Sequence, residues 1–518
     1  MKKIISAKEA TELVPDSATI CICGFVGSNI PEELLESVEK RYLSEGHPNN
    51  LTIIHSAAIG DGDYRGVNRL AHEGLVKRIV GGHFNLAPKM GRMIADNKVE
   101  AYNWPQGTLT QWIRDISARK PGIITRVGLN TFVDPRVEGG KLNDVTTDEL
   151  IEVVHMNGEE FLWYKPFPVN VTFLRGTTAD MNGNISTEHE AVKLELVSAA
   201  LAAKASGGIV VVQVERLAES GTISPKDVVV PGIDVDYVVV ASAPEYSEQS
   251  YGTAYNPSYA GETRIPLSQI PPMPMSARKI IARRAAMELV PHAVVNLGIG
   301  IPEGVSSVAN EEQVGDQLIL TVEAGPIGGV PAGGGEFGAS ANAEAIMEHP
   351  YQFDFYDGGG LDIAYLGLAE TNSNGDLNVS KFKGRIAGCG GFINITQNTP
   401  KVVFCGTFTA KGLQEEVQDG KLIINQEGAV HKFLKNIDQI TFSGTFAREH
   451  QQTVLYITER CVFQLGDEGL VLTEIAPGID LQKDVLAQMD FEPIVSPDLK
   501  MMDTRIFKDE CMGMQLSD

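Results

Sequence analysis

The chain has 518 residues, of which 43% are hydrophobic, and its formal net charge is -24. This length predicts about two to four domains, and the acidic balance argues against general nucleic-acid binding, because that function needs a basic face to replace phosphate counterions. No apolar run approaches the length of a membrane helix, and the first residues lack the apolar core of a signal peptide, so we expect a cytoplasmic protein with no membrane partner.

Two similar segments open the two halves of the chain. Residues 3–15 (KIISAKEATELVP) return as residues 279–291 (KIIARRAAMELVP), and each copy leads through an apolar run into a glycine-rich turn that ends in Ile-Pro-Glu. Chance rarely repeats residue type, order and turn together. The sequence therefore predicts two fused, related units and a function that needs both.

Short runs of β-branched residues alternate with helical stretches in both units. Strands are predicted at 51–54, 209–212, 237–240, 318–322 and 402–405, and helices at 7–14, 31–40, 191–203 and 277–290. Nearly all-apolar strands between helices are typical of a parallel sheet covered on both faces. We predict an α/β fold made of two tandem, related open α/β domains with largely parallel sheets.

A polar segment rich in proline, tyrosine and serine lies between residues 243 and 276. It has no helical or strand period, so we interpret it as a linker between a domain at 1–242 and a domain at 277–518. Asn-Gly turns within 182–186 and 374–378 predict one hairpin in each domain.

The spacing of cysteine and histidine predicts neither a disulfide framework nor a metal site. The six cysteines are scattered, and Cys21 and Cys23 alternate within an apparent strand, as small buried hydrophobic residues do. His83, which follows two glycines, has the most loop-like context of the histidines. We expect catalysis without a metal.

A glycine-rich turn at 296–303 (NLGIGIPE) follows a predicted strand in the second unit. Glycine lets the backbone approach a ligand, and Pro302 at a helix start leaves the next amides free for an anion. Gly298 and Gly300 fit the start of a dinucleotide fingerprint, and Glu323 lies where such folds carry a ribose-binding acid. Glu303 stands where the third glycine belongs, however, which argues against a nicotinamide site.

Glu323 ends an apolar strand and opens a loop, 324–335, that is half glycine. The carboxyl ends of parallel strands form the ligand crevice of an open α/β sheet, so this carboxylate is a candidate for the chemistry. Glycine runs at 358–360 and 388–391 could supply the backbone N–H groups of an oxyanion hole, although a single glycine run is more often a tight turn.

Four motifs resemble those of the family I CoA-transferases: the Gly-Ile-Gly-Ile-Pro turn, Glu-x-Gly at 323–325, Gly-Gly-x-Asp at 359–362 and Pro-Gln-Gly-Thr-Leu at 105–109. Across nearly its full length the chain is similar to the fused single-chain branch of that family, which includes propionate (lactate) and acetate CoA-transferases. Elsewhere in the family the two halves are separate α and β subunits, so the resemblance accounts for the duplication.

The resemblance implies that Glu323 is the catalytic nucleophile, that coenzyme A is a substrate and that no cofactor is permanently bound. It implies ping-pong transfer of CoA between short-chain carboxylic acids, such as acetate and propionate, through a glutamyl-CoA thioester, and it suggests a homo-oligomer, either a dimer or a tetramer. The expected CoA-binding residues are Gly298, Ile299, Gly300, Ile301, Pro302, Gly388, Gly390, Gly391 and Lys411, with Lys383 and Arg385 as further candidates for the phosphates. The expected acyl-pocket residues are Gly24, Phe25, Val26, Gly27 and Gln106.

Two alternatives stay open from the sequence. An acyl-CoA hydrolase on the same scaffold would let water intercept the glutamyl intermediate, and nothing in the sequence separates it from a transferase. A non-catalytic CoA-binding sensor is disfavoured, because a sensor has no use for a nucleophile in a glycine-rich loop.

Overall fold

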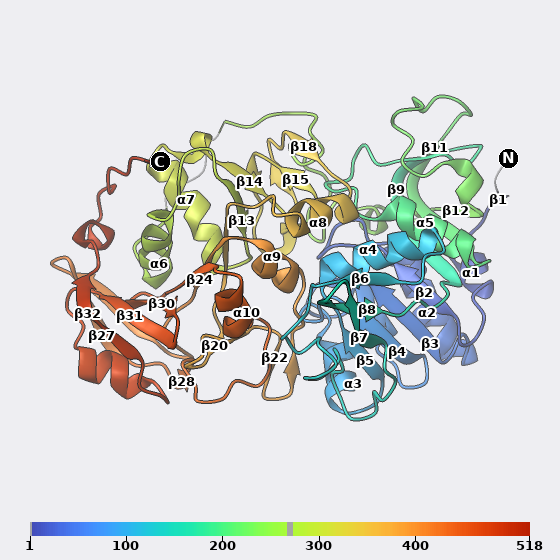
Figure 1. Cartoon of the computed structure of the whole chain (residues 1–518). Coiled ribbons are helices and arrows are strands. Elements are labelled where there is room, and N and C mark those ends of the chain that lie inside the picture. The colour runs from blue at the N-terminus through green and yellow to red at the C-terminus, as the bar shows by residue number, and fades with distance from the viewer. Residues whose placement is uncertain (1–2, 267–272, 518) are drawn as a thin grey trace.

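The computed structural model describes residues 3–266 and 273–517 and contains one large sheet in each half of the chain (Figure 1). The first sheet has the strand order β1-β12-β11-β9-β2-β3-β4-β5, and β10 pairs with β9. All of its pairings are parallel except the β9–β10 hairpin. Its strands are β1 (Lys3–Ile4), β2 (Thr19–Ile22), β3 (Leu51–His55), β4 (Val76–Gly81), β5 (Glu100–Asn103), β9 (Val171–Asp180), β10 (Ile185–Ser186), β11 (Ile209–Ala218) and β12 (Tyr237–Val240).

Neighbouring residues of the strands belong to different hydrophobic cores, which shows that both faces of this sheet are covered. In β2, Ile20 and Ile22 belong to one buried cluster, and Cys21 belongs to another together with Cys23 just beyond the strand. Successive side chains of a strand point to opposite faces, so two cores require cover on both sides. The first half also contains a small antiparallel sheet, β6 (Ile123–Thr125), β7 (Ile151–Met156) and β8 (Glu159–Tyr164), and the helices α1 (Ala7–Glu12), α2 (Glu32–Glu45), α3 (Pro88–Ala95), α4 (Gln106–Ser117) and α5 (Leu196–Ala205).

The second sheet has the order β18-β15-β14-β13-β19-β24-β29-β30-β31-β32. Its central strands, from β14 to β29, pair in parallel, and antiparallel pairings occur toward both edges. The strands are β13 (Val294–Leu297), β14 (Ile319–Thr321), β15 (Pro326–Ile327), β18 (Ala345–Ile346), β19 (Ile363–Gly367), β24 (Lys401–Cys405), β29 (Thr453–Ile457), β30 (Cys461–Gly466), β31 (Gly469–Ile475) and β32 (Ile494–Met501).

The described part of the second half also contains five α-helices, several single turns of 3-10 or π-helix, and five short antiparallel strand pairs. The helices are α6 (Ala277–Ala286), α7 (Gly304–Glu311), α8 (His349–Asp357), α9 (Phe392–Asn398) and α10 (Gly444–Glu449). The pairs are β16 (Val330–Pro331) with β17 (Ser340–Ala341), β20 (Glu370–Thr371) with β21 (Leu377–Asn378), β22 (Lys381–Phe382) with β23 (Arg385–Ile386), β25 (Thr409–Ala410) with β28 (Val430–His431), and β26 (Gln414–Gln418) with β27 (Lys421–Gln426).

The α/β prediction is confirmed, and both Asn-Gly turns close hairpins, β9–β10 and β20–β21. The helix predicted at 191–203 was wrong at its start, since α5 begins only at Leu196. Leu194 has a φ of 52°, in the left-handed region that an α-helix excludes. Residues 191–195 therefore form a turn, which places Glu195 at the head of the helix.

The segment interpreted as a linker, 243–276, contacts both halves. Its residues 267–272 lie outside the described residues. In the rest, Tyr246 donates to Glu36 of the first half (2.7 Å) and Ser250 to the carbonyl of Gly335 in the second (3.0 Å). Within 3–266 and 273–517, no helix is long and apolar enough to cross a membrane.

Candidate active site

A cavity of about 490 Å³ lies where loops of the two halves meet. Its lining includes six of the residues expected to form the site, which are Phe25, Val26, Gln106, Ile299, Glu323 and Gly390. These residues follow the carboxyl ends of β2, β5, β13 and β14 or belong to the glycine run before α9. Ligand sites of open α/β sheets form at such strand ends, and here two sheets contribute to one site.

Glu323 reaches the cavity from the turn after β14, where Gly325 N donates to the carbonyl of Val322 (3.0 Å). Gly325 has a φ of 126°, and a Cβ there would lie 2.2 Å from the carbonyl oxygen of Met347. Only glycine fits this position, which explains the Glu-x-Gly pattern. Burial raises the pKa of Glu323 to about 7.

The glycine run 388–391 packs directly against Glu323. A Cβ on Gly391 would lie 2.4 Å from Oε2 of Glu323, so the close approach requires glycine. The amides of Gly388 and Gly390 donate within the protein, to the carbonyl oxygens of Ser380 (2.8 Å) and Gly82 (2.8 Å). These two N–H groups are therefore engaged, as is that of Cys389, which donates to Asn103 (2.9 Å). Among the described residues no acceptor is found for the N–H of Gly391, whose Cα lies next to Glu323.

The turn after β2 forms the inner wall of the cavity. Phe25 and Val26 are 2% and 7% exposed, and Val26 has a φ of 56°, which is rare for a β-branched residue. Gly24 and Gly27 are buried beside them but do not line the cavity. A Cβ on Gly27 would lie 2.7 Å from the backbone nitrogen of Tyr251, so the turn is held tightly against the interdomain segment.

The corresponding turn after β13 lies at the mouth of the cavity. Ile299 is 54% exposed and lines the cavity, whereas the neighbouring Gly298, Gly300, Ile301 and Pro302 do not. Arg278 fixes the turn by donating to the carbonyl of Gly300 (2.7 Å).

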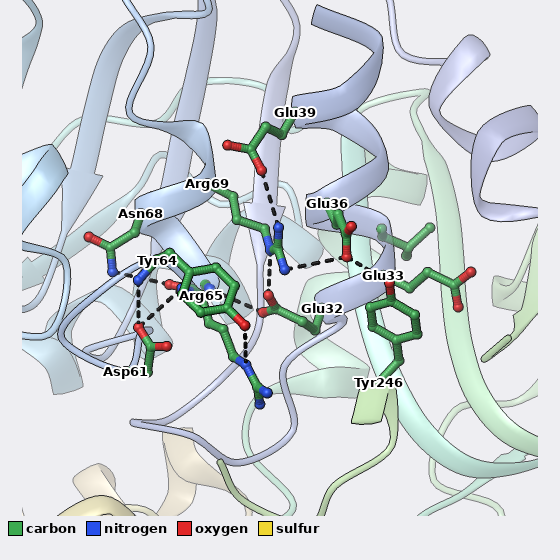
Figure 2. Close-up of polar contacts among 12 residues, drawn as sticks. Glu32, Glu33, Glu36, Glu39, Asp61, Tyr64, Arg65, Asn68, Arg69 and Tyr246 are labelled. Atoms are coloured by element: carbon green, nitrogen blue, oxygen red, sulfur yellow. Dashed lines mark hydrogen bonds and ion pairs between the residues drawn. The ribbon is translucent and has the colours of Figure 1, made fainter. Parts of the chain in front are cut away.

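An ionic cluster supports the outer wall, where Tyr251 and Asp61 line the cavity. Figure 2 shows that Arg69 points toward Glu32, Glu36 and Glu39. Its guanidinium nitrogens lie 2.5, 3.3 and 3.2 Å from their carboxylate oxygens. The other oxygen of Glu32 accepts from the hydroxyl of Tyr251 (2.5 Å). Asp61 accepts the backbone N–H groups of residues 63, 64 and 65, which fixes its loop beside the cluster.

The basic residues proposed for the CoA phosphates have different positions. Arg385 donates to Asn85, a lining residue, so it lies beside the cavity. Lys383 is exposed two residues away, with its backbone nitrogen bonded to Asp438. Lys411 is exposed on the turn after β25 and does not line the cavity, so its role stays a prediction.

Sequence analysis missed Tyr251, because the surrounding residues lack any periodic pattern. The usable signal was composition: flexible linkers contain few aromatic residues, yet 243–276 contains Tyr246, Tyr251, Tyr255 and Tyr259. His83, weighed as a loop histidine, does line the cavity, where burial lowers its pKa to about 4. The described parts of the chain contain no cluster of His, Cys, Asp or Glu able to hold a metal.

Comparisons with known proteins agree with this geometry. Residues 4–241 match the family model for coenzyme A transferase. The chain is 50% identical to caffeate CoA-transferase of Acetobacterium woodii, over 99% of each protein, and 45% identical to acetate CoA-transferase YdiF of Escherichia coli (strain K12), over 99% of this chain and 96% of that protein. Its fold matches the crystal structure of acyl-CoA transferase YdiF from E. coli O157:H7 in a thioester complex with CoA, with a TM-score of 0.94, 44% identity and coverage of 99% and 98%. The chain belongs to the coenzyme A transferase family and is a CoA-transferase.

Proposed function

We propose that the protein transfers CoA between short-chain carboxylic acids by a ping-pong mechanism in which Glu323 is the nucleophile. The observation that carries the proposal is the position of this carboxylate, in a cavity between the two halves and in contact range of the Gly391 backbone. A pKa near 7 leaves a large ionised fraction at neutral pH, and its sparse solvation favours attack.

Each half-reaction balances without a metal or an energy source. The Glu323 carboxylate attacks the thioester carbonyl of an acyl-CoA, the C–S bond breaks, and a mixed anhydride and a CoA thiolate form. The thiolate then attacks the glutamyl carbonyl, and the first acid leaves as a carboxylate while a glutamyl-CoA thioester remains. A second carboxylate reverses these steps and leaves as the new acyl-CoA.

We propose that the N–H of Gly391 stabilises the oxyanion that forms during these attacks. It adjoins the reacting carboxylate, and a backbone donor already in position needs no reorganisation during the reaction. We propose that the Gln106 side chain is the second donor, because it lines the same cavity as Glu323.

For CoA itself, we propose an approach past Ile299, with the pantetheine arm along the turn 298–302 and Arg385 near the phosphates. Ile299 is an exposed hydrophobic residue at the mouth of the cavity, as contact with an alkyl arm requires. The cavity of about 490 Å³ must hold the end of this arm together with the acyl group, which favours small acids such as acetate and propionate. A cytoplasmic location and a homo-oligomer are part of the proposal.

A second candidate acid is aromatic. The relative that is 50% identical is a caffeate CoA-transferase, and the cavity is lined by the rings of Phe25, Phe337 and Tyr251. Comparing kcat/KM for acetate, propionate and caffeate as acceptors separates the two candidates, since a pocket built for an aromatic acid would prefer caffeate.

Intact-protein mass spectrometry after mixing with acetyl-CoA tests the mechanism. We expect a covalent CoA adduct on the parent and on the control variant Glu344→Gln, which changes an exposed glutamate outside the cavity. The adduct should be absent from Glu323→Gln and discharged by propionate. CoA binding without an adduct would contradict the proposal and favour a sensor, whereas free CoA released without an acceptor acid would indicate a hydrolase.

A further inference from the structure

Four buried polar side chains form a hydrogen-bonded chain beside Glu323. Ser56 Oγ donates to Glu195 Oε1 (2.6 Å), Glu195 Oε2 lies 2.7 Å from Nδ1 of His349, and Nε2 of His349 lies 3.0 Å from Nε2 of Gln106. None of the four residues is more than 1% exposed. Burying polar groups is unfavourable unless their hydrogen bonds are made. A connected series of hydrogen bonds next to a cavity therefore indicates that these side chains have a functional role.

The chain of hydrogen bonds crosses between the halves of the protein. Glu195 heads α5 and Gln106 opens α4 in the first half, whereas His349 opens α8 in the second. The backbone nitrogen of His349 donates to the carbonyl of Leu194 (3.1 Å), whose left-handed backbone turns Glu195 into place. The two halves therefore fix this arrangement together.

The imidazole is also enclosed by aromatic rings. Phe25 and Phe353 lie 5.9 and 5.4 Å from it, centroid to centroid. Phe25 belongs to the inner wall of the cavity. Packing of this kind holds the plane of the ring, so both nitrogens keep their partners.

The donors and acceptors of each side chain fix the direction of the hydrogen bonds from Glu195 to Gln106. As a carboxylate, Glu195 only accepts, so Nδ1 of His349 carries the hydrogen, and the contact of Nε2 with the Gln106 nitrogen requires Nε2 to accept. Gln106 must then turn its NH₂ group toward the ring. The second N–H of that group is left for Glu323, which lines the same cavity as Gln106.

We infer that Glu195 and His349 are positioning residues, which hold the Gln106 amide so that it donates to Glu323 and to the oxyanion formed at that residue. Neither lines the cavity, so both act through Gln106. The inference deepens the proposed function and rests on it. Substitution of a residue that orients a reacting group typically lowers activity by about 10- to 100-fold.

Two substitutions of His349 separate positioning from packing. Asparagine can reach the place of Nδ1 and keep Glu195 bonded, but it leaves Gln106 without an acceptor. Glutamine can reach the place of Nε2 and offer its carbonyl oxygen to Gln106, but it leaves Glu195 short of a donor. The measurements are the single-turnover rate of adduct formation from acetyl-CoA and the KM for acetyl-CoA.

We expect His349→Asn to slow adduct formation by about 10²-fold with little change in KM, and His349→Gln to slow it by less than about tenfold. If His349 had a purely structural role, His349→Gln would be the more impaired variant, because it leaves the buried carboxylate of Glu195 without a donor. Equal losses, or a larger loss in His349→Gln, would overturn the inference.

Glu195→Gln serves as the second variant if thermal unfolding shows that His349→Asn does not fold. The neutral amide keeps the volume but no longer fixes the hydrogen on Nδ1, so we expect slower adduct formation at an unchanged KM, and an unchanged rate would overturn the inference. If the parent forms no adduct, the proposed function fails and this inference with it. A parent adduct with unaffected variants leaves the transferase standing without the positioning pair.

Discussion

The turns after β2 and β13 are two copies of one sequence motif in different surroundings. In the first, Phe25 is 2% exposed and Gly27 is pressed against Tyr251. In the second, Ile299 is 54% exposed, and a Cβ on Gly298, the counterpart of Gly27, would meet only the end of the Leu366 side chain at 3.0 Å and backbone at 3.3 Å. Duplication therefore supplied two similar loops, and burial made one the wall of the cavity and the other its mouth.

Phe25→Ala gives the largest effect expected from this comparison. Removing a buried ring should lower the free energy of unfolding by about 3–5 kcal/mol, and the space left in the wall should shift the acceptor preference toward larger acids. Urea unfolding and kcat/KM for a series of acids measure both. A loss of stability below about 1 kcal/mol would mean that the first turn is not part of the core.

Exchanging glycine for alanine in each turn sharpens the comparison. The Cβ of Gly27→Ala would meet backbone at 2.7 Å, which predicts a destabilisation of about 1–3 kcal/mol. The matched change Gly298→Ala meets the flexible end of Leu366 at 3.0 Å and backbone no closer than 3.3 Å, so it should cost less. Denaturant midpoints of the two variants decide the matter, and an equal cost would remove the distinction between the turns.

Glu323, which lies in the cavity between the two turns, should make the reaction pH-dependent. With a pKa of about 7 and a nucleophile that must be ionised, the rate of adduct formation should fall about tenfold per pH unit well below 7. A rate that stays flat down to pH 5 would contradict the raised pKa.

The same shift has a consequence for stability with the opposite trend. Because the folded pKa is raised from 4.5 to about 7, the fold favours the protonated form, and this contribution is present at low pH and lost as the pH rises through that range. Glu323→Gln should therefore unfold at a higher temperature than the parent by a wider margin at pH 8 than at pH 4. Thermal scans at the two pH values test the sign.

Ile299→Ala should have the smallest effect. An exposed side chain contributes little to folding, so the stability should stay within about 0.5 kcal/mol of the parent. Loss of contact with the CoA arm should raise the KM for acyl-CoA about threefold and leave kcat unchanged, since uniform binding is removed. A fall in kcat instead would move this residue closer to the reacting atoms.

The alternation of strands and helices was predictable because it depends on local residue order. The Glu-x-Gly turn likewise carries its own explanation in the conformation of Gly325. The free amide of Gly391 was not predictable, because the acceptors that engage Gly388 and Gly390 are the distant carbonyls of Ser380 and Gly82. The contribution of Tyr251 depends in the same way on Glu32, which is far away in the sequence.

Segment 243–276, which connects the two halves, gives the single chain a property that two separate polypeptides would lack. It joins Tyr251 to Glu32 of the first half and Tyr259 to Glu336 of the second (2.6 Å), so a strip of the cavity wall is itself the tether. The halves cannot be diluted apart, because their effective concentration is set by the linker and not by the amount of protein. A single proteolytic cleavage between these two tyrosines would leave both sheets intact. It would nevertheless release part of the wall of the cavity that the two halves share.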